Sequence, residues 1–227
     1  MKYEIQHTVM QSLEVQLGQG ESVYTQAGGM AWMTDGIEMT TSGKGGMMGA
    51  LGRVMAGSSL LLTTYKSSVP NAAVTFVTDA PGKILGMELK AGQSLMAQRD
   101  TFLVAQESVT FEAAFTKKLG VGVFGGEGFV LQKITGPGLF WAEISGEVQE
   151  YTLAPNQMMK ISAGHVAMFE PTVTYDIQMV KGITNILFAG EGLYLATLKG
   201  PGKIWLQTMP VSSLAAAIRQ FIPTKSS

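Results

Sequence analysis

The chain of 227 residues contains no cysteine and only two histidines. The absence of cysteine excludes a disulfide framework, a thiolate zinc site, an iron–sulfur cluster and a cysteine nucleophile. Two histidines cannot form a three-histidine metal site, and an enzyme of the cupin type needs more histidines than this chain has. We therefore expect no catalytic residues, no metal and no cofactor, and we predict that the protein is not an enzyme.

Charge is scarce as well. Lys and Arg number 16 and Asp and Glu number 17, so the formal net charge is −1 and charged residues make up 15% of the chain, against roughly 25% in an average domain. Without a basic excess, nucleic acid is not an expected partner. The surface is either rich in Gly, Ser, Thr and Gln or partly covered by another chain.

Long hydrophobic runs are also missing. The most apolar stretch, residues 47–62, is interrupted by Arg53, Ser58 and Ser59, and it is shorter than the ~20 apolar residues of a membrane-spanning helix. The first residues lack the apolar region of a signal peptide. We expect a cytoplasmic protein.

Glycine, in contrast, is abundant, and it recurs in register. At an offset of 64 residues, one set of glycines and aromatics falls on a second set. The first set is Phe124, Gly126, Glu127, Gly128, Leu131, Gly136, Pro137, Gly138 and Trp141, and the second is Phe188, Gly190, Glu191, Gly192, Leu195, Gly200, Pro201, Gly202 and Trp205. A fainter copy lies upstream at an offset of 72. The repeats predict three related units, residues 1–79, 80–143 and 144–209.

Each unit is predicted to be built from β-strands. Apolar and polar residues alternate over 109–116 and over 173–179, which is typical of strands with one buried face. Pro137 and Pro201, each between two glycines, favour type II turns. These turns predict hairpins that pair residues 129–134 with 139–144 and residues 193–198 with 203–206.

Two segments depart from the strand pattern. Residues 43–57 form a Gly- and Met-rich insert in the first unit, at best a short, weak helix because of the cost of glycine. Residues 210–227 contain a helix-favouring run with apolar Leu214, Ala217, Ile218 and Phe221, closed by Pro223. The second segment predicts a short C-terminal docking helix followed by a tail.

Several candidate sites have both a functional and a structural interpretation. Residues 120–125 match the letters of the dinucleotide fingerprint, but a strand and not a helix is expected to follow, so a β-connection is favoured. Glu127 and Glu191 suit either a structural turn or a ring of ligand-binding acids. His165 suits a hydrogen-bonded loop better than a catalytic base.

The repeated tryptophans and the insert are the remaining candidates. Trp141 and Trp205 are expected to be core or interface anchors, with an exposed aromatic platform for a ligand as the alternative. The insert is either an inter-unit linker or a candidate interaction segment for an anionic membrane or a partner protein. Its candidate interaction residues are Lys44, Met47, Met48, Leu51, Arg53 and Met55.

The doubled glycine motif also carries a resemblance. Residues 124–141 and 188–207, together with 164–171 and 173–176, resemble the bacterial and archaeal relatives of the mitochondrial biogenesis family "altered inheritance of mitochondria, protein 24". The family is similar in fold to the tryptophan RNA-binding attenuator protein, which implies short double-stranded β-helix units assembled in rings. For fungal members it implies a role in mitochondrial inner-membrane organisation, and some prokaryotic members are linked to membrane stress.

The sequence therefore predicts an all-β chain of three repeated double-stranded β-helix or β-sandwich-like units in pseudo-threefold arrangement, with a short C-terminal helix. Free sheet edges invite pairing with another chain, so we expect a homo-oligomer, with a homotrimer as the first choice. The predicted function is a non-enzymatic scaffold or interaction protein, associated peripherally with the inner face of the membrane or with membrane-stress proteins. The alternative is a small-molecule-binding β-barrel, with the ligand near Glu127, Glu191 and the tryptophan pair.

Overall fold

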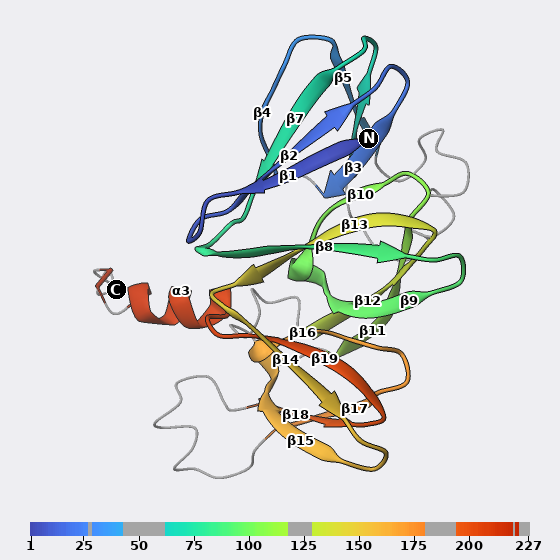
Figure 1. The fold of residues 1–227 in the computed structure, drawn as a ribbon. Helices are drawn as coiled ribbons and strands as arrows, with labels where there is room; N and C mark the ends of the chain where they lie inside the picture. Colours follow the sequence, from blue (N-terminus) through green and yellow to red (C-terminus); the bar gives the residue numbers. More distant parts are fainter. Residues whose placement is uncertain (27–28, 43–61, 118–128, 180–193, 220, 223–227) are drawn as a thin grey trace.

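The computed structural model describes residues 1–26, 29–42, 62–117, 129–179, 194–219 and 221–222. The described part contains antiparallel strands and one α-helix near the C-terminus, so the predicted all-β class and short helix are confirmed. In Figure 1 the strands form three groups that follow one another along the chain, from blue through green and yellow to red.

The first strand group spans residues 2–77 and has two arms. One arm is a sheet with the order β1-β2-β7-β4, and in the other arm β6 lies between β5 and β3. Its strands are β1 (Lys2–Gln6), β2 (Ser12–Leu17), β3 (Ser22–Gln26), β4 (Met30–Met33), β5 (Ile37–Ser42), β6 (Leu62–Ser67) and β7 (Ala72–Val77).

The second and third groups each have six strands among the described residues. The second consists of β8 (Gly82–Leu89), β9 (Ser94–Gln98), β10 (Phe102–Gln106), β11 (Thr110–Lys117), β12 (Phe129–Thr135) and β13 (Gly138–Ser145). The third consists of β14 (Val148–Leu153), β15 (Met158–Ser162), β16 (Val166–Phe169), β17 (Thr174–Met179), β18 (Tyr194–Lys199) and β19 (Gly202–Gln207).

The same pairing order occurs in all three groups. One arm reads β2-β7-β4, β8-β13-β10 and β14-β19-β16, and the other reads β5-β6-β3, β11-β12-β9 and β17-β18-β15. Each group also has a shift in strand register at the same position of the repeat. The shift lies between Met30 and Trp32, between Phe102 and Val104, and between Val166 and Met168. These correspondences reproduce the offsets of 72 and 64 in the sequence.

Neighbouring groups are joined by continuous sheets. Strand β3 pairs with β10, with Thr25 opposite Val104, and β9 pairs with β16, with Ala97 opposite Met168. Two six-stranded sheets therefore each combine three strands of one group with three of the next. The groups are arranged in series, and the pseudo-threefold arrangement stays a prediction.

The Gly-Pro-Gly segments are crossings between sheets, and the predicted hairpins are wrong. Strand β12 pairs with β11 and β9, whereas β13 pairs with β10 and β8. Strands β18 and β19 likewise belong to different sheets. The Gly136–Pro137 and Gly200–Pro201 bonds are cis. A short turn predicts a change of direction but not the partner of the strand that follows.

Close backbone contact explains the glycines at these crossings. A Cβ atom on Gly136 would lie 2.6 Å from the carbonyl oxygen of Leu89, and one on Gly200 would lie 2.5 Å from that of Ala154. A side chain at either glycine would push the Gly-Pro-Gly segment away from the carbonyl group that it contacts.

The two repeated tryptophans are anchors between groups. Trp141 is fully buried in a cluster with Leu13, Val15 and Phe76 of the first group. Trp205 is 5% exposed and packs in the cluster that contains Phe102 and Phe140 of the second group. The prediction of core or interface anchors is confirmed for both, and the alternative of an exposed aromatic platform is wrong.

The helix α3 (Val211–Arg219) leads away from the strands (Figure 1). The apolar residues predicted to dock it are largely at the surface, since Ile218 is 50% and Phe221 85% exposed. Only Leu214 is partly buried among residues 211–218. The helix is confirmed, but the described part of the chain does not cover its apolar face.

Candidate functional site

The predicted site residues fall into three sets. Trp141 and Trp205 are the buried anchors described above. The six residues of the two Gly-Pro-Gly segments lie at the sheet crossings and have a structural role. The others lie outside the described residues: Gly126, Glu127, Gly128, Gly190, Glu191, Gly192, Lys44, Met47, Met48, Leu51, Arg53 and Met55.

His165 has the loop role that the sequence favoured. It ends the short 3₁₀ turn η3 (Ala163–His165), and its Nδ1 lies 2.8 Å from the carbonyl oxygen of Gln207. This contact fixes the turn onto the end of β19.

The first candidate site is the pair of open edges at the ends of the strand series. Among the described strands, β4 pairs with β7 alone, although its counterparts β10 and β16 each have a second partner. In β4, Trp32 is 58% and Met33 38% exposed. The residues at the same positions in β10, Val104 and Ala105, are fully buried. The apolar side chains of β4 are therefore exposed, whereas the side chains at the same positions of β10 are buried by the neighbouring group.

Strand β15 is the matching open edge at the other end. Its counterparts β3 and β9 each pair with a strand of the next group, whereas β15 pairs with β18 alone in the part of the chain that the structure describes. Met158 is 66% exposed, and Lys160 is exposed as well. An exposed edge presents unpaired N–H and C=O groups that can accept another strand.

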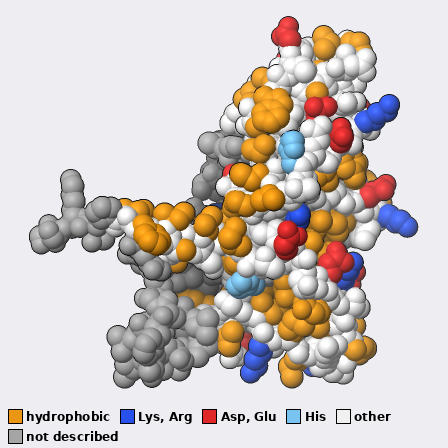
Figure 2. Space-filling model, turned by 60° about the vertical axis from the view of Figure 1, so that its left-hand side comes forward, with side chains coloured by type: hydrophobic (Ala, Val, Ile, Leu, Met, Phe, Trp, Pro, Cys, Tyr) orange, Lys and Arg blue, Asp and Glu red, His pale blue; other side chains and the backbone are white. Residues whose placement is uncertain are grey.

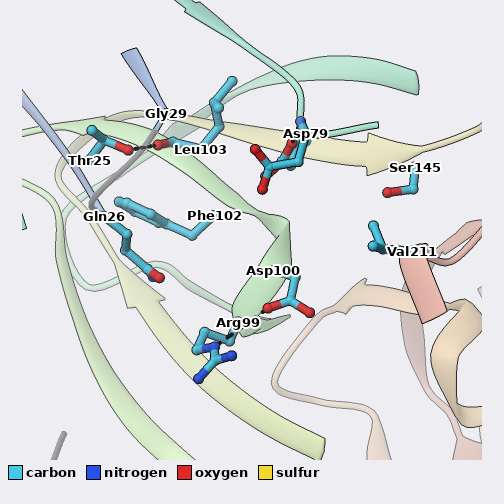
Figure 3. Close-up of a pocket in the computed structure, with 11 residues that line it drawn as sticks. Thr25, Gln26, Gly29, Asp79, Arg99, Asp100, Phe102, Leu103, Ser145 and Val211 are labelled. Carbon is cyan, nitrogen blue, oxygen red and sulfur yellow. Dashed lines mark hydrogen bonds and ion pairs between the residues drawn. The ribbon is translucent and has the colours of Figure 1, made fainter. Parts of the chain in front are cut away.

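The second candidate site is a cavity of about 190 Å³ at the junction of the first two groups. Figure 3 shows Asp79 above it, Arg99 and Asp100 below it, and Val211 of α3 at one side. Glu143 of β13 also lines it. The 3₁₀ turn η1 (Arg99–Thr101) contributes Arg99 and Asp100 to the lining. These two residues form an ion pair, with Arg99 Nε 3.5 Å from Asp100 Oδ1.

Glu143 is the electrostatically unusual group of this cavity. Its side chain is partly buried, and its Oε2 accepts a 3.1 Å hydrogen bond from the backbone N–H of Asp79. Burial raises the pKa of Glu143 to about 8; the Asp79 N–H acts against this, while the charges of Asp79 and Asp100 add to it. The carboxyl group therefore keeps its proton at neutral pH.

Sequence reasoning did not single out Glu143, although a signal was present. At the offset of 64, Glu143 falls on Gln207, and Asp79 falls on Glu143. A carboxyl group in one unit thus stands where the next unit has an amide. Charge differences between repeated positions could have identified this junction.

The described residues contain no cluster of three His, Cys, Asp or Glu side chains placed to hold a metal ion. Among the described helices, none is long and apolar enough to cross a membrane.

Figure 2 shows apolar side chains spread over the strand groups and along α3, with acidic and basic side chains scattered between them.

Comparison with known proteins covers nearly the whole chain. Residues 3–209 match the family described as Mitochondrial biogenesis AIM24. An uncharacterized protein of Streptococcus pyogenes serotype M6 (strain ATCC BAA-946 / MGAS10394) is 27% identical in an alignment over 234 residues, gaps included, that covers 100% of this chain and 93% of the relative. The X-ray crystal structure of a Streptococcus pyogenes protein, a structural genomics target, has a TM-score of 0.77 at 25% identity and covers 97% of this chain and 99% of that chain.

Proposed function

The chain belongs to the Mitochondrial biogenesis AIM24 family, and from that premise we propose that it is a non-enzymatic scaffold assembled from several copies by end-to-end strand pairing. The observation that supports this proposal most directly is the pair of open edges, β4 and β15. Within the chain, the counterparts of these two strands form both junctions between groups. A contact between β15 of one copy and β4 of the next would repeat the same junction between chains.

The internal junctions also specify the register of this contact. Thr25 lies opposite Val104 and Tyr24 opposite Ala105 in the first junction. Carried over by the repeat, Trp32 lies opposite Ile161 of the next copy, and Met33 lies opposite Lys160. Pairing then covers the exposed Trp32, and apolar burial of this kind is worth roughly 25 cal/mol per Å².

The proposed assembly is a closed homotrimer. Two different edges in contact make a head-to-tail interface, which forms a ring when the rotation closes and a filament when it does not. Three copies would give nine strand groups in one ring. The low charge of the sequence supports an assembly in which part of the surface is covered.

A charge reversal tests the interface and its register together. Met33→Lys places a lysine directly opposite Lys160, and like charges opposite each other destabilise strand pairing. We expect this variant to be monomeric and the double variant Met33→Lys with Lys160→Glu to recover the wild-type mass by light scattering. Met39→Lys, on the exposed face of β5, is the matched control and should leave the mass unchanged. A wild-type monomer, or a Met33→Lys variant with wild-type mass, would contradict the proposal.

We also propose that the scaffold works at the inner face of a membrane, with the Gly/Met insert as the contact. Apolar Met47, Met48 and Leu51 beside Lys44 and Arg53 have the composition of a segment that binds an anionic lipid surface. The test is flotation with vesicles of anionic and of zwitterionic lipid, using the full chain and a variant without residues 43–57. Flotation that is absent, or that persists after the deletion, would remove the insert from the proposal.

The cavity at the first junction supports a second candidate function, small-molecule binding. Its volume of about 190 Å³ is below the ~300 Å³ at which ligand pockets typically begin, so only a very small ligand would fit. The buried Trp141 and Trp205 do not form the ligand platform that the sequence left open. Native mass spectrometry of freshly purified protein decides between the candidates, because a bound molecule of constant mass would favour this one.

A further inference from the structure

The two junctions between strand groups differ at one pair of equivalent residues, Glu143 in β13 and Gln207 in β19. Both lie two residues after the buried tryptophan of their strand, at the offset of 64. The strands around them pair in the same order. The junctions therefore offer an internal comparison between a carboxyl group and an amide in one structural position.

At the second junction the amide both accepts and donates a hydrogen bond. Gln207 Oε1 accepts a 3.2 Å hydrogen bond from the backbone N–H of Ser145. Gln207 Nε2 donates a 2.8 Å hydrogen bond to the carbonyl oxygen of Gly164. One accepting and one donating atom at the end of the side chain thus tie β19 to both neighbouring segments.

At the first junction an ionised Glu143 can reproduce only the hydrogen bond that Gln207 accepts, because a carboxylate has no hydrogen to donate. Glu143 Oε2 accepts from the N–H of Asp79 at 3.1 Å. At the offset of 64, the counterpart of the Gly164 carbonyl is that of Asp100 in the equivalent turn η1, and a carboxylate cannot donate to a carbonyl oxygen. A carboxylic acid, however, carries one O–H donor beside its acceptor oxygen and so matches the amide of Gln207.

We propose that Glu143 is a proton-dependent latch of the first junction, closed when the carboxyl group is neutral and opened when it ionises. In the closed state the acid holds Asp79 and the Asp100 turn together as Gln207 holds Ser145 and Gly164. In the open state the new negative charge faces two further carboxylates, Asp79 from the β7–β8 connection and Asp100 from η1. Among the described residues that line this cavity, Arg99 is the cation, and it forms an ion pair with Asp100; α3 contributes the apolar Val211.

The direction of the pH effect follows from the raised pKa. The ordinary pKa of a glutamate is 4.5, and burial first of all raises that of Glu143 to about 8. Between these values the folded chain holds a proton that the unfolded chain has lost, so the contribution of Glu143 to stability falls as pH rises through this window. Above about pH 8 the folded protein carries the charge, and the junction opens locally.

Amide hydrogen exchange measures this opening at each junction separately. After correction for the intrinsic exchange rate, we expect protection at Tyr24 and Ala105 to fall about tenfold between about pH 6 and about pH 9.5. Protection at Met96 and Phe169, the equivalent pair at the second junction, should stay nearly constant. An equal change at both junctions, or no change at either, would overturn the proposal.

Amide and acid variants complete the test. Glu143→Gln should abolish the pH dependence at the first junction, and Gln207→Glu should create it at the second. Glu88→Gln removes the same charge from an exposed position on β8 and should behave as wild type. A Glu143→Gln chain that fails to fold would also overturn the proposal, because an amide must fit where the neutral acid fits.

Discussion

The indole Nε1 of Trp205 donates a 2.8 Å hydrogen bond to Oε1 of Glu150 across the β14–β19 pair. The equivalent tryptophan, Trp141, faces Gly86 instead of a glutamate. The ring of Tyr3 packs edge-on against Trp141 there, with 5.2 Å between ring centroids. A Cβ atom on Gly86 would lie 2.8 Å from the Tyr3 hydroxyl. The first strand of the chain thus occupies the space that a longer side chain fills in the third group.

The Trp205–Glu150 bond predicts a stability loss in Glu150→Ala. A buried indole N–H without an acceptor costs about 1 to 3 kcal/mol, and we expect a loss of about 1 kcal/mol or more in urea denaturation at neutral pH. Glu150→Gln keeps an acceptor and should cost less. If both variants matched wild type, the hydrogen bond would have no measurable role.

The same site predicts a dependence on acid pH. Lys203 Nζ lies 2.6 Å from Glu150 Oε2, and this contact, helped by the Trp205 N–H and opposed by burial, lowers the pKa of Glu150 below 4.5. The stabilisation is therefore complete above about pH 4.5 and is lost as pH falls through the lowered value. The stability difference between wild type and Glu150→Ala should shrink in acid, as measured by unfolding at several pH values. A difference that grew in acid would contradict this assignment.

The crossing between β12 and β13 predicts that Gly136→Ala is destabilising. The added Cβ would lie 2.6 Å from the Leu89 carbonyl oxygen, and overpacking of this kind costs about 1 to 3 kcal/mol. Gly18→Ala is the control, because its Cβ would come no closer than 3.4 Å to Glu21. Thermal unfolding should place Gly136→Ala clearly below Gly18→Ala, and equal midpoints would show that the crossing tolerates a side chain.

A hydrogen bond from a backbone N–H to a side chain recurs in each of the three groups, and it predicts how Glu21→Gln and Glu21→Ala change stability. The side chains of Glu21, Gln93 and Gln157 each accept a hydrogen bond from the backbone N–H three residues earlier, at 2.8, 3.1 and 2.8 Å. Glutamine at position 21 keeps this bond and loses only the pair with the N-terminal ammonium, worth about 0 to 1 kcal/mol. Glu21→Ala should cost more than Glu21→Gln in chemical denaturation, and the reverse order would contradict the shared role.

The exposed face of α3 predicts that Ile218→Ser leaves stability almost unchanged. Ile218 is 50% exposed, and surface substitutions usually alter stability by no more than about 0.5 kcal/mol. Ile134→Ser, at a fully buried position, is the contrasting variant and should be strongly destabilised. A large loss in Ile218→Ser would mean that another part of the chain or another copy covers the helix.

The local elements and their correspondence were accessible from the sequence. Alternation over 173–179 predicted a strand, and the structure has β17 at Thr174–Met179. The offsets of 64 and 72 recur as matched strand registers, and the short C-terminal helix is present. Burial of Trp141 and Trp205 also followed, because repeated aromatics usually serve packing. All of these features depend on residues close in sequence or on the comparison of one segment with another.

Only the tertiary structure decided which strands pair and what the junctions contain. The runs beside Gly136-Pro137-Gly138 are strands as expected, but they enter different sheets, since pairing is set by contacts with β9 and β10 far along the chain. The cavity behind Glu143 arises where Asp79, Asp100 and Glu143 meet from three separate segments. Strand periodicity is a local property of the chain, whereas the partner of a strand and the charge around a partly buried carboxyl group depend on residues that only folding brings together.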